Sequence, residues 1–339
     1  MPRFDALFDL VAEVTGHTAA QWLRTHVEVP AGLTGFIWDS ERLHRAWLAE
    51  ALNLCLFHKL VQAVPDGQRY VEEQAEAGRR VRFDHGAIRT VDWPENGALP
   101  RGRLAFSRLL EPLGFTDVRT YPLNKLNMTG WAYQHQDLPA DIAQFFVSEL
   151  HPGRFSEPFQ AAVGRVVADS REPLQPEHLA TLQTLRRSRH CSPAAAYQLL
   201  PALYRAFDCQ HGPAREADYR LLREESAEMA WIATEGNRFN HLTDRVDDLE
   251  STVAVQRHKA RPMKPSVEVS SSGRVRQTAY RAVTVHRPLL DGFGVARLHE
   301  VPGSFVEFIQ RQVDPDTGEL DLAFDSGNAQ GIFKMTDAR

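Results

Sequence analysis

The sequence has few cysteines, no long apolar run and no excess of positive charge. Only three cysteines occur among 339 residues, and Cys55, Cys191 and Cys209 form no C-x-x-C pair. This spacing excludes a disulfide framework and a zinc knuckle, so we expect reduced thiols in a cytoplasmic protein. No apolar stretch approaches the roughly 20 residues of a membrane-spanning helix. The first residues include Asp5, where a signal peptide would have an apolar core. We therefore expect a soluble protein with no membrane partner.

The formal net charge of -5 argues against broad binding to nucleic acid, which requires a basic face. Short basic clusters such as residues 186–190 are typical of a solvated helix surface. The composition, 43% hydrophobic and 24% charged, is that of an ordinary globular protein. A chain of this length can bury a sizeable core without disulfides. We expect a small-molecule partner, and the oligomeric state stays open.

Changes in sequence pattern divide the chain into four regions. Residues 1–79 are predicted to be mainly helical, because apolar positions recur at spacings of three and four, for example over 43–61. Residues 80–151 follow the order strand, helix, strand, strand, strand. Residues 152–235 are again helical, with Pro and Ser/Asp signals at several helix starts. Residues 236–339 repeat the earlier order. The predicted fold is α+β, with two β-α-β-β-β modules separated by a helical insertion.

A short motif recurs in the first strand of each module. Residues 83–85 are Phe-Asp-His and residues 239–241 are Phe-Asn-His. The last strands are also alike: residues 146–148 are Phe-Val-Ser and residues 305–307 are Phe-Val-Glu. If the modules pair about a pseudo-twofold axis, their first and last strands line one cavity. Four side chains are then predicted to converge there: His85, Ser148, His241 and Glu307.

Two imidazoles and one carboxylate form the facial triad that suits non-haem iron(II) and leaves coordination positions open. Ser148 would be a weak or absent fourth ligand, so we expect it to face the metal without binding it. A histidine beside an aromatic residue in a strand is more often part of the core, so His85 alone would not make this case. Glu307 has apolar neighbours, and a buried carboxylate without a partner costs several kcal/mol. It needs a cation, either a metal or one of Arg245 and Arg311.

Arg89 is expected on the same strand face as His85, because side chains alternate along a strand. Four residues at about 3.3 Å each place the two roughly 13 Å apart. The long arginine side chain can reach back and hold a carboxylate with two hydrogen bonds. A short dicarboxylate would then fit between its guanidinium and the metal. The alternative is a surface arginine at a strand end.

Several segments resemble the 2-oxoadipate dioxygenase/decarboxylase family, formerly an uncharacterised glyoxalase-like family. They are FDHGAIRTV at 83–91, FVSEL at 146–150, NHLT at 240–243, RQTA at 276–279, VPGSFVEFIQR at 301–311 and FDSGNAQGIFKMT at 324–336. The resemblance covers most of 80–336. It implies a vicinal oxygen chelate barrel, bound iron(II), and conversion of 2-oxoadipate and O2 to 2-hydroxyglutarate and CO2 in lysine degradation. It also implies metal binding by His85, His241 and Glu307 and substrate binding by Arg89.

The C-terminal part is also similar to hydroxyphenylpyruvate dioxygenase, in which a Glu-x-Ile-Gln-Arg strand supplies a carboxylate ligand and a helix covers the site. Residues 326–334 would form that lid, and Asn328 and Phe333 would line the cavity together with Gln277 and Thr278. The 2-oxoadipate enzymes are longer at the C-terminus, with a segment that contributes to substrate binding. The resemblance therefore implies the metal chemistry better than it implies the exact 2-oxo acid.

Two other functions are compatible with the same scaffold. A glyoxalase-type isomerase or lyase would use zinc, nickel or manganese, would work without oxygen, and would need a fourth protein ligand such as Glu149 or Gln277. A non-enzymatic ligand-binding protein would lack the metal, and two histidines and a glutamate at matched positions argue against it. Iron(II) is the expected cofactor, although another divalent metal could occupy the site in a purified sample.

Overall fold

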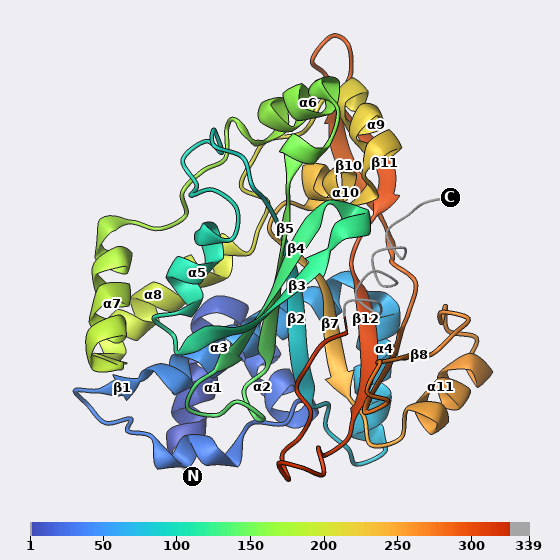
Figure 1. Cartoon of the computed structure of the whole chain (residues 1–339). Coiled ribbons are helices and arrows are strands. Elements are labelled where there is room, and N and C mark those ends of the chain that lie inside the picture. The colour runs from blue at the N-terminus through green and yellow to red at the C-terminus, as the bar shows by residue number, and fades with distance from the viewer. Residues whose placement is uncertain (1, 326–339) are drawn as a thin grey trace.

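An eight-stranded sheet forms the centre of the protein (Figure 1). The computed structural model describes residues 2–325. The strands follow the order β3-β4-β5-β2-β7-β12-β9-β8. Their bounds are β2 Phe83–Val91, β3 Phe115–Leu123, β4 Met128–His135, β5 Gln144–Leu150, β7 Phe239–Arg245, β8 Glu268–Val269, β9 Val275–Ala279 and β12 Phe305–Arg311.

Strand pairing follows the same pattern on both sides of the central, antiparallel β2/β7 pair. Strand β2 pairs in parallel with β5, and β7 pairs in parallel with β12. The next pair outward is antiparallel on each side. One helix follows each central strand in the sequence, α5 (Leu104–Leu110) after β2 and α11 (Leu249–His258) after β7. The mixed α+β class is confirmed, whereas the division into four regions stays a prediction.

Most of the α-helices within residues 2–325 fall in two groups along the sequence. Four precede the sheet: α1 Pro2–Thr15, α2 His17–His26, α3 Arg45–Ala63 and α4 Pro65–Glu76. Five lie between β5 and β7: α6 Glu157–Val167, α7 Pro176–Ser188, α8 Pro193–Ala206, α9 Glu216–Glu225 and α10 Ala227–Glu235. Serines at 156, 192 and 226 cap α6, α8 and α10 by accepting a backbone N–H, as the sequence signals indicated. Within residues 2–325 no helix is long and apolar enough to span a membrane.

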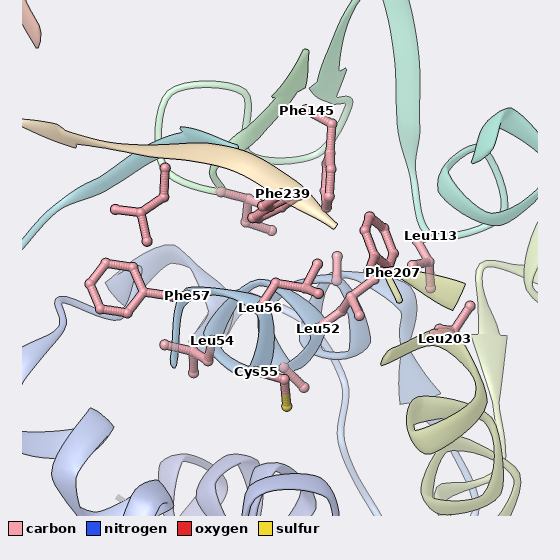
Figure 2. Close-up of a cluster of buried hydrophobic side chains, with 14 of the residues drawn as sticks. Leu52, Leu54, Cys55, Leu56, Phe57, Leu113, Phe145, Leu203, Phe207 and Phe239 are labelled. Atoms are coloured by element: carbon pink, nitrogen blue, oxygen red, sulfur yellow. The ribbon is translucent and has the colours of Figure 1, made fainter. Parts of the chain in front are cut away.

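The face of the sheet that packs against α3 is called the outer face here, and the opposite face the inner face. Figure 2 shows the contact between α3 and the outer face, where Leu52, Leu56 and Phe57 lie below Phe145 and Phe239. The rings of Phe145 and Phe239 are 5.8 Å apart. Since burial of a large apolar side chain contributes about 1.5–3 kcal/mol, this layer fixes the position of the central strands.

Two β-bulges explain the repeated Phe-Asx-His motif. Within residues 83–85, the first and third residues pair with consecutive residues of β7, so Asp84 is an extra residue in the ladder. Within residues 239–241, Asn240 is the extra residue in the same way. On a regular strand, residues two apart point to the same face. Each bulge instead directs the phenylalanine into the outer core and the histidine to the inner face.

A hairpin between β9 and β12 was not predicted. Strands β10 (Thr284–Leu290) and β11 (Ala296–Pro302) form a separate two-stranded sheet at the end of the molecule where α9 and α10 lie (Figure 1). The turn is stabilised by Asp291, whose Oδ1 accepts the backbone N–H groups of Phe293 and Val295. The glycines and the proline of this stretch concealed the strand pattern. The three cysteines form no disulfide, as expected.

Candidate metal centre

His85, His241 and Glu307 meet on the inner face, on the neighbouring strands β2, β7 and β12 (Figure 1). One candidate ligand atom from each lies within 4.8 Å of the other two. Glu307 Oε2 is 3.3 Å from His85 Nε2 and 3.7 Å from His241 Nε2. The three residues are at most 5% exposed. The parallel pairing of β7 with β12 produces this arrangement. It sets Phe305 beside His241, so that Glu307 lies two residues farther along β12, beside Thr243.

Sequence reasoning did not single out Thr243, which lies between the candidate ligands. Its hydroxyl donates to Glu307 Oε2 at 2.7 Å and lies 3.0 Å from His85 Nε2. Thr243 is fully buried and is the register partner of both His85 and Glu307. Its position two residues after His241, on the same strand face, was the available signal. Thr243 holds the carboxylate oriented toward the histidines.

These residues fit a divalent cation. Glu307 Oε1 and His241 Nδ1 are buried and have no hydrogen-bond partner within the described part of the chain. Burial lowers the pKa of His241 to about 3, so the imidazole is neutral. Burial alone would raise the pKa of Glu307, but the neighbouring His85 and His241 and the Thr243 hydroxyl lower it overall. A neutral imidazole and a carboxylate are the forms that bind a metal.

Asp84 and Arg311 orient His85. Asp84 Oδ1 accepts from His85 Nδ1 at 2.8 Å, and Arg311 donates to Asp84 from Nη2 at 2.8 Å and from Nε at 2.9 Å. The Arg311 guanidinium helps to hold the pKa of Asp84 well below its usual range, against the effect of burial. A carboxylate on Nδ1 leaves the Nε2 lone pair for a metal. Arg311 is therefore the partner of Asp84 and not, as one alternative had it, of Glu307.

Arg245, the other alternative partner of Glu307, also lies elsewhere. It approaches Asp84 Oδ2 at 4.0 Å and donates to the carbonyl of Ala140 at 2.9 Å. No ion pair joins Glu307 to an arginine or a lysine within residues 2–325. Within the described residues, the groups that face the Glu307 carboxylate are therefore His85, His241 and Thr243, a set that could hold a metal.

The structure corrects the position of Ser148. Register pairs His85 with Gln144 in one half and His241 with Phe305 in the other. Two residues farther along, Glu307 therefore corresponds to Phe146. Ser148 lies on the inner face but level with Arg89, and its hydroxyl donates to the Ile88 carbonyl at 3.0 Å. The alignment of the two Phe-Val pairs was wrong because bulges and strand lengths, which set the register, cannot be read from two shared residues.

Arg89 is buried on the inner face and is only 1% exposed, so it is not a surface arginine. Its guanidinium carbon lies 5.0 Å from the centre of the Trp231 ring, a cation–π distance. Burial lowers the pKa of Arg89 to about 10, and the charge of Glu228 opposes that shift. Arg89 is therefore charged at neutral pH. Helix α10, which carries both Trp231 and Glu228, was not recognised as part of this region from the sequence.

The remaining predicted residues lie in different places. Gln277 is buried on the inner face, whereas Thr278 points to the outer face and donates to the Ser266 carbonyl at 3.0 Å, so its assignment to the cavity was wrong. Glu149 points away from His85 and accepts the Arg103 N–H at 2.6 Å, near Asp92 and His151. The predicted lid at 326–334, with Asn328 and Phe333, lies outside the described residues.

Phe324 is the first residue of the motif at 324–336 and was not predicted to line the site, but its ring packs beside the candidate metal ligands. Its ring lies 4.7 Å from the His85 ring and 5.0 Å from the Phe146 ring. Tyr121 fixes the segment, because its hydroxyl accepts the Phe324 N–H at 2.9 Å. Arg311 also donates to the carbonyls of Asp321 and Ala323. The segment therefore covers one side of His85 with an aromatic ring.

Comparisons with known structures find the same fold in other proteins. A crystal structure from Ralstonia eutropha JMP134, described as a glyoxalase superfamily protein, is 48% identical, with a TM-score of 0.90 over 95% of this chain and 98% of the other. The hydroxyglutarate synthase of Oryza sativa in complex with 2-oxoadipate is 15% identical, with a TM-score of 0.66 over 89% and 97%. That of Pseudomonas putida, also with 2-oxoadipate, is 18% identical, with a TM-score of 0.61 over 89% and 75%. At these low identities the two synthases show a shared fold.

A search of curated protein sequences gave no match. Among protein-family models, that of 2-oxoadipate dioxygenase/decarboxylase matches residues 53–319, which include all three candidate ligands and Arg89. This match covers well over half of the sequence. The chain therefore belongs to the 2-oxoadipate dioxygenase/decarboxylase family.

Proposed function

We propose that this chain is an iron(II)-dependent dioxygenase and decarboxylase of a 2-oxo dicarboxylic acid, converting 2-oxoadipate and O2 to 2-hydroxyglutarate and CO2. The convergence of His85, His241 and Glu307 carries the proposal. Two imidazoles and one carboxylate are typical of non-haem iron oxygenases. Family membership and the 2-oxoadipate bound in two solved relatives support the substrate class. The reaction would belong to lysine degradation in the cytoplasm, and the two halves of the sheet would be the paired modules of a vicinal oxygen chelate fold.

Each residue has a defined task in this proposal. His85, His241 and Glu307 would hold the metal, which supplies redox chemistry with O2. Asp84 would keep the proton of His85 on Nδ1, away from the metal. Arg89 would bind the distal carboxylate, because a buried guanidinium can hold a carboxylate with two charge-assisted hydrogen bonds. Phe324 and Phe146 would keep water from the adjoining side.

The geometry disfavours the two alternatives. An isomerase needs a fourth protein ligand, and Glu149 points away from the other three. Gln277 lies on the inner face but two residues beyond Ala279, the register partner of Glu307. A non-enzymatic binding protein would not need three buried ligand groups, two of which leave an atom unpartnered.

The test is anaerobic loading with Fe(II), followed by oxygen uptake with 2-oxo acids of four to seven carbons. We expect uptake equal to CO2 release with 2-oxoadipate, and no product without O2. An isomerase or lyase would convert substrate without oxygen and with zinc, nickel or manganese. Turnover under those conditions, or no oxygen uptake with any of the acids, would refute the proposal. His241→Ala should lose both bound metal and oxygen uptake.

A further inference from the structure

A partly buried ion pair lies on the inner face near Glu307, and the proposed reaction does not involve it. Lys264 Nζ donates to Glu268 Oε1 at 2.6 Å, and Lys264 is only 7% exposed. Glu268 Oε2 is buried and has no hydrogen-bond partner within the described residues. The ammonium is buried and the carboxylate is half-buried, so the pair is costly to desolvate and a functional role would explain it.

Strand register determines the direction in which Lys264 points. Met263 pairs with Tyr280 in an antiparallel bridge, and both side chains belong to the core on the outer face. Because side chains alternate, Lys264 points to the inner face. Its N–H donates to the Ala279 carbonyl at 2.8 Å, and Ala279 is the register partner of Glu307. Glu307, Ala279 and Lys264 thus form one row across the sheet.

Only a methyl group stands between Lys264 and Glu307 in this row. At about 4.8 Å between strands, their backbones are roughly 10 Å apart, which two long side chains can bridge. The negative charge of Glu307 acts on the Lys264–Glu268 pair, since it adds to the effect of burial in raising the pKa of Glu268. Arg89 lies on the other side of the candidate ligands, on β2. Two buried cations therefore flank the centre from opposite halves of the sheet.

We propose that Lys264 is a positioning residue that binds the carboxylate next to the keto group of the 2-oxo acid, while Arg89 binds the distal one. This inference rests on the proposed function. An ammonium group has three donors, of which Glu268 accepts one. Glu268 would hold the ammonium over Ala279 and keep the pair neutral before the acid binds. The two cations then set the direction of the acid, with its reactive end toward Glu307 and Lys264.

The test compares two acids that share the reactive end. 2-Oxohexanoate has the keto acid group of 2-oxoadipate but lacks the distal carboxylate. Kd values for both are measured by calorimetry without oxygen on the Fe(II)-loaded protein, together with metal content. Lys264→Met should weaken the binding of both acids by about 10- to 100-fold, because it removes a charge-assisted hydrogen bond common to both. Arg89→Met should weaken only 2-oxoadipate. Metal content should be unchanged in both variants.

Two further variants separate positioning from structure. Lys264→Met combined with Glu268→Gln avoids leaving a half-buried carboxylate unpaired, and we expect both acids to bind this variant as weakly as they bind Lys264→Met. Lys59→Met is the matched control, because Lys59 also forms a partly buried ion pair, at 2.6 Å with Asp208, but lies on α3. Its Kd values should equal those of the wild type. Recovery of binding in the double variant, or wild-type Kd values in Lys264→Met, would overturn the inference alone. A wild type that binds neither acid would overturn the proposed function as well.

Discussion

Asp84→Asn removes one negative charge between His85 and Arg311 while keeping the size of the side chain. In the wild type, the Asp84 carboxylate accepts hydrogen bonds from His85 Nδ1 at 2.8 Å and from Arg311 at 2.8 and 2.9 Å. An amide has one acceptor oxygen in place of two, so it cannot serve both partners in full. It also leaves the Arg311 charge, whose side chain is fully buried, without its counterion.

Two separate losses follow from this geometry. A buried charge that loses its partner costs about 3–5 kcal/mol. Arg311 keeps the carbonyls of Asp321 and Ala323 at 2.9 and 2.8 Å, so we expect the lower end, about 3 kcal/mol in the free energy of unfolding of the metal-free protein. The metal affinity should fall by about 10- to 100-fold, because the carboxylate that orients the His85 ring is gone.

The two losses are measured independently, by urea unfolding of the metal-free protein and by metal competition against a coloured chelator. Asp244→Asn is the control, because Asp244 is also buried on a central strand but faces outward and accepts the Tyr70 hydroxyl at 2.5 Å. Its metal affinity should equal that of the wild type. If Asp84→Asn lost stability but bound metal within about threefold of the wild type, Asp84 would be only the partner of Arg311. The assignment of His85 Nε2 as a ligand atom would then lose its support.

Three further predictions concern charge and packing around the sheet. Burial and the charge of Asp141 raise the pKa of Glu50 to about 8, so the folded state holds a proton that the unfolded state releases near pH 4.5. Stability should therefore fall as pH rises from about 4.5 to about 8, and Glu50→Gln should flatten this slope in unfolding experiments; equal slopes would contradict it. Arg89→Met should raise the KM for 2-oxoadipate by about 100-fold at unchanged metal content, and Arg89→Lys should recover little of the lost activity. If Arg89→Met were as active on 2-oxoadipate as the wild type, the assignment of a dicarboxylate substrate would be wrong. Gly86→Ala would place a methyl 2.3 Å from the Phe239 ring and should cost about 1–3 kcal/mol in unfolding free energy, whereas an unchanged midpoint would mean that the strands shift freely.

The sequence predicted the central strands and the candidate ligands because each had a strong local signal. The predicted order of one strand, one helix and three strands within 80–151 is found as β2, α5, β3, β4 and β5, whose apolar and aromatic residues end at clear turn signals. The repeated Phe-Asx-His motif located His85 and His241, and its apolar neighbours singled out Glu307. The parity argument placed Arg89 on the inner face, where it lies. These inferences needed only the alternation of side chains along a strand.

What could not be predicted depends on register between strands far apart in the sequence. The bulge at Asp84 lets its carboxylate contact both His85 and Arg311, and no pattern within 83–91 indicates it. Register also decides that Phe146, not Ser148, corresponds to Glu307. The position of Lys264 could not be predicted for the same reason, because only its pairing beside Ala279 brings it to the inner face. Such positions follow from loop lengths and packing rather than from local preference.

The symmetry of the sheet and the asymmetry of its side chains together account for a single centre with open positions. His85 and His241 occupy equivalent places, and symmetry alone would supply a second carboxylate opposite Glu307. Phe146 stands there instead, packed against Phe324 with ring centres 5.0 Å apart. A carboxylate at that place would add a fourth protein ligand and a second negative charge. An aromatic side chain donates nothing to a metal and excludes water, so a bound metal would keep free positions on a dry side. With only His85, His241 and Glu307 as protein ligands, a bound metal would keep the open positions that the proposed reaction of a 2-oxo acid with oxygen requires.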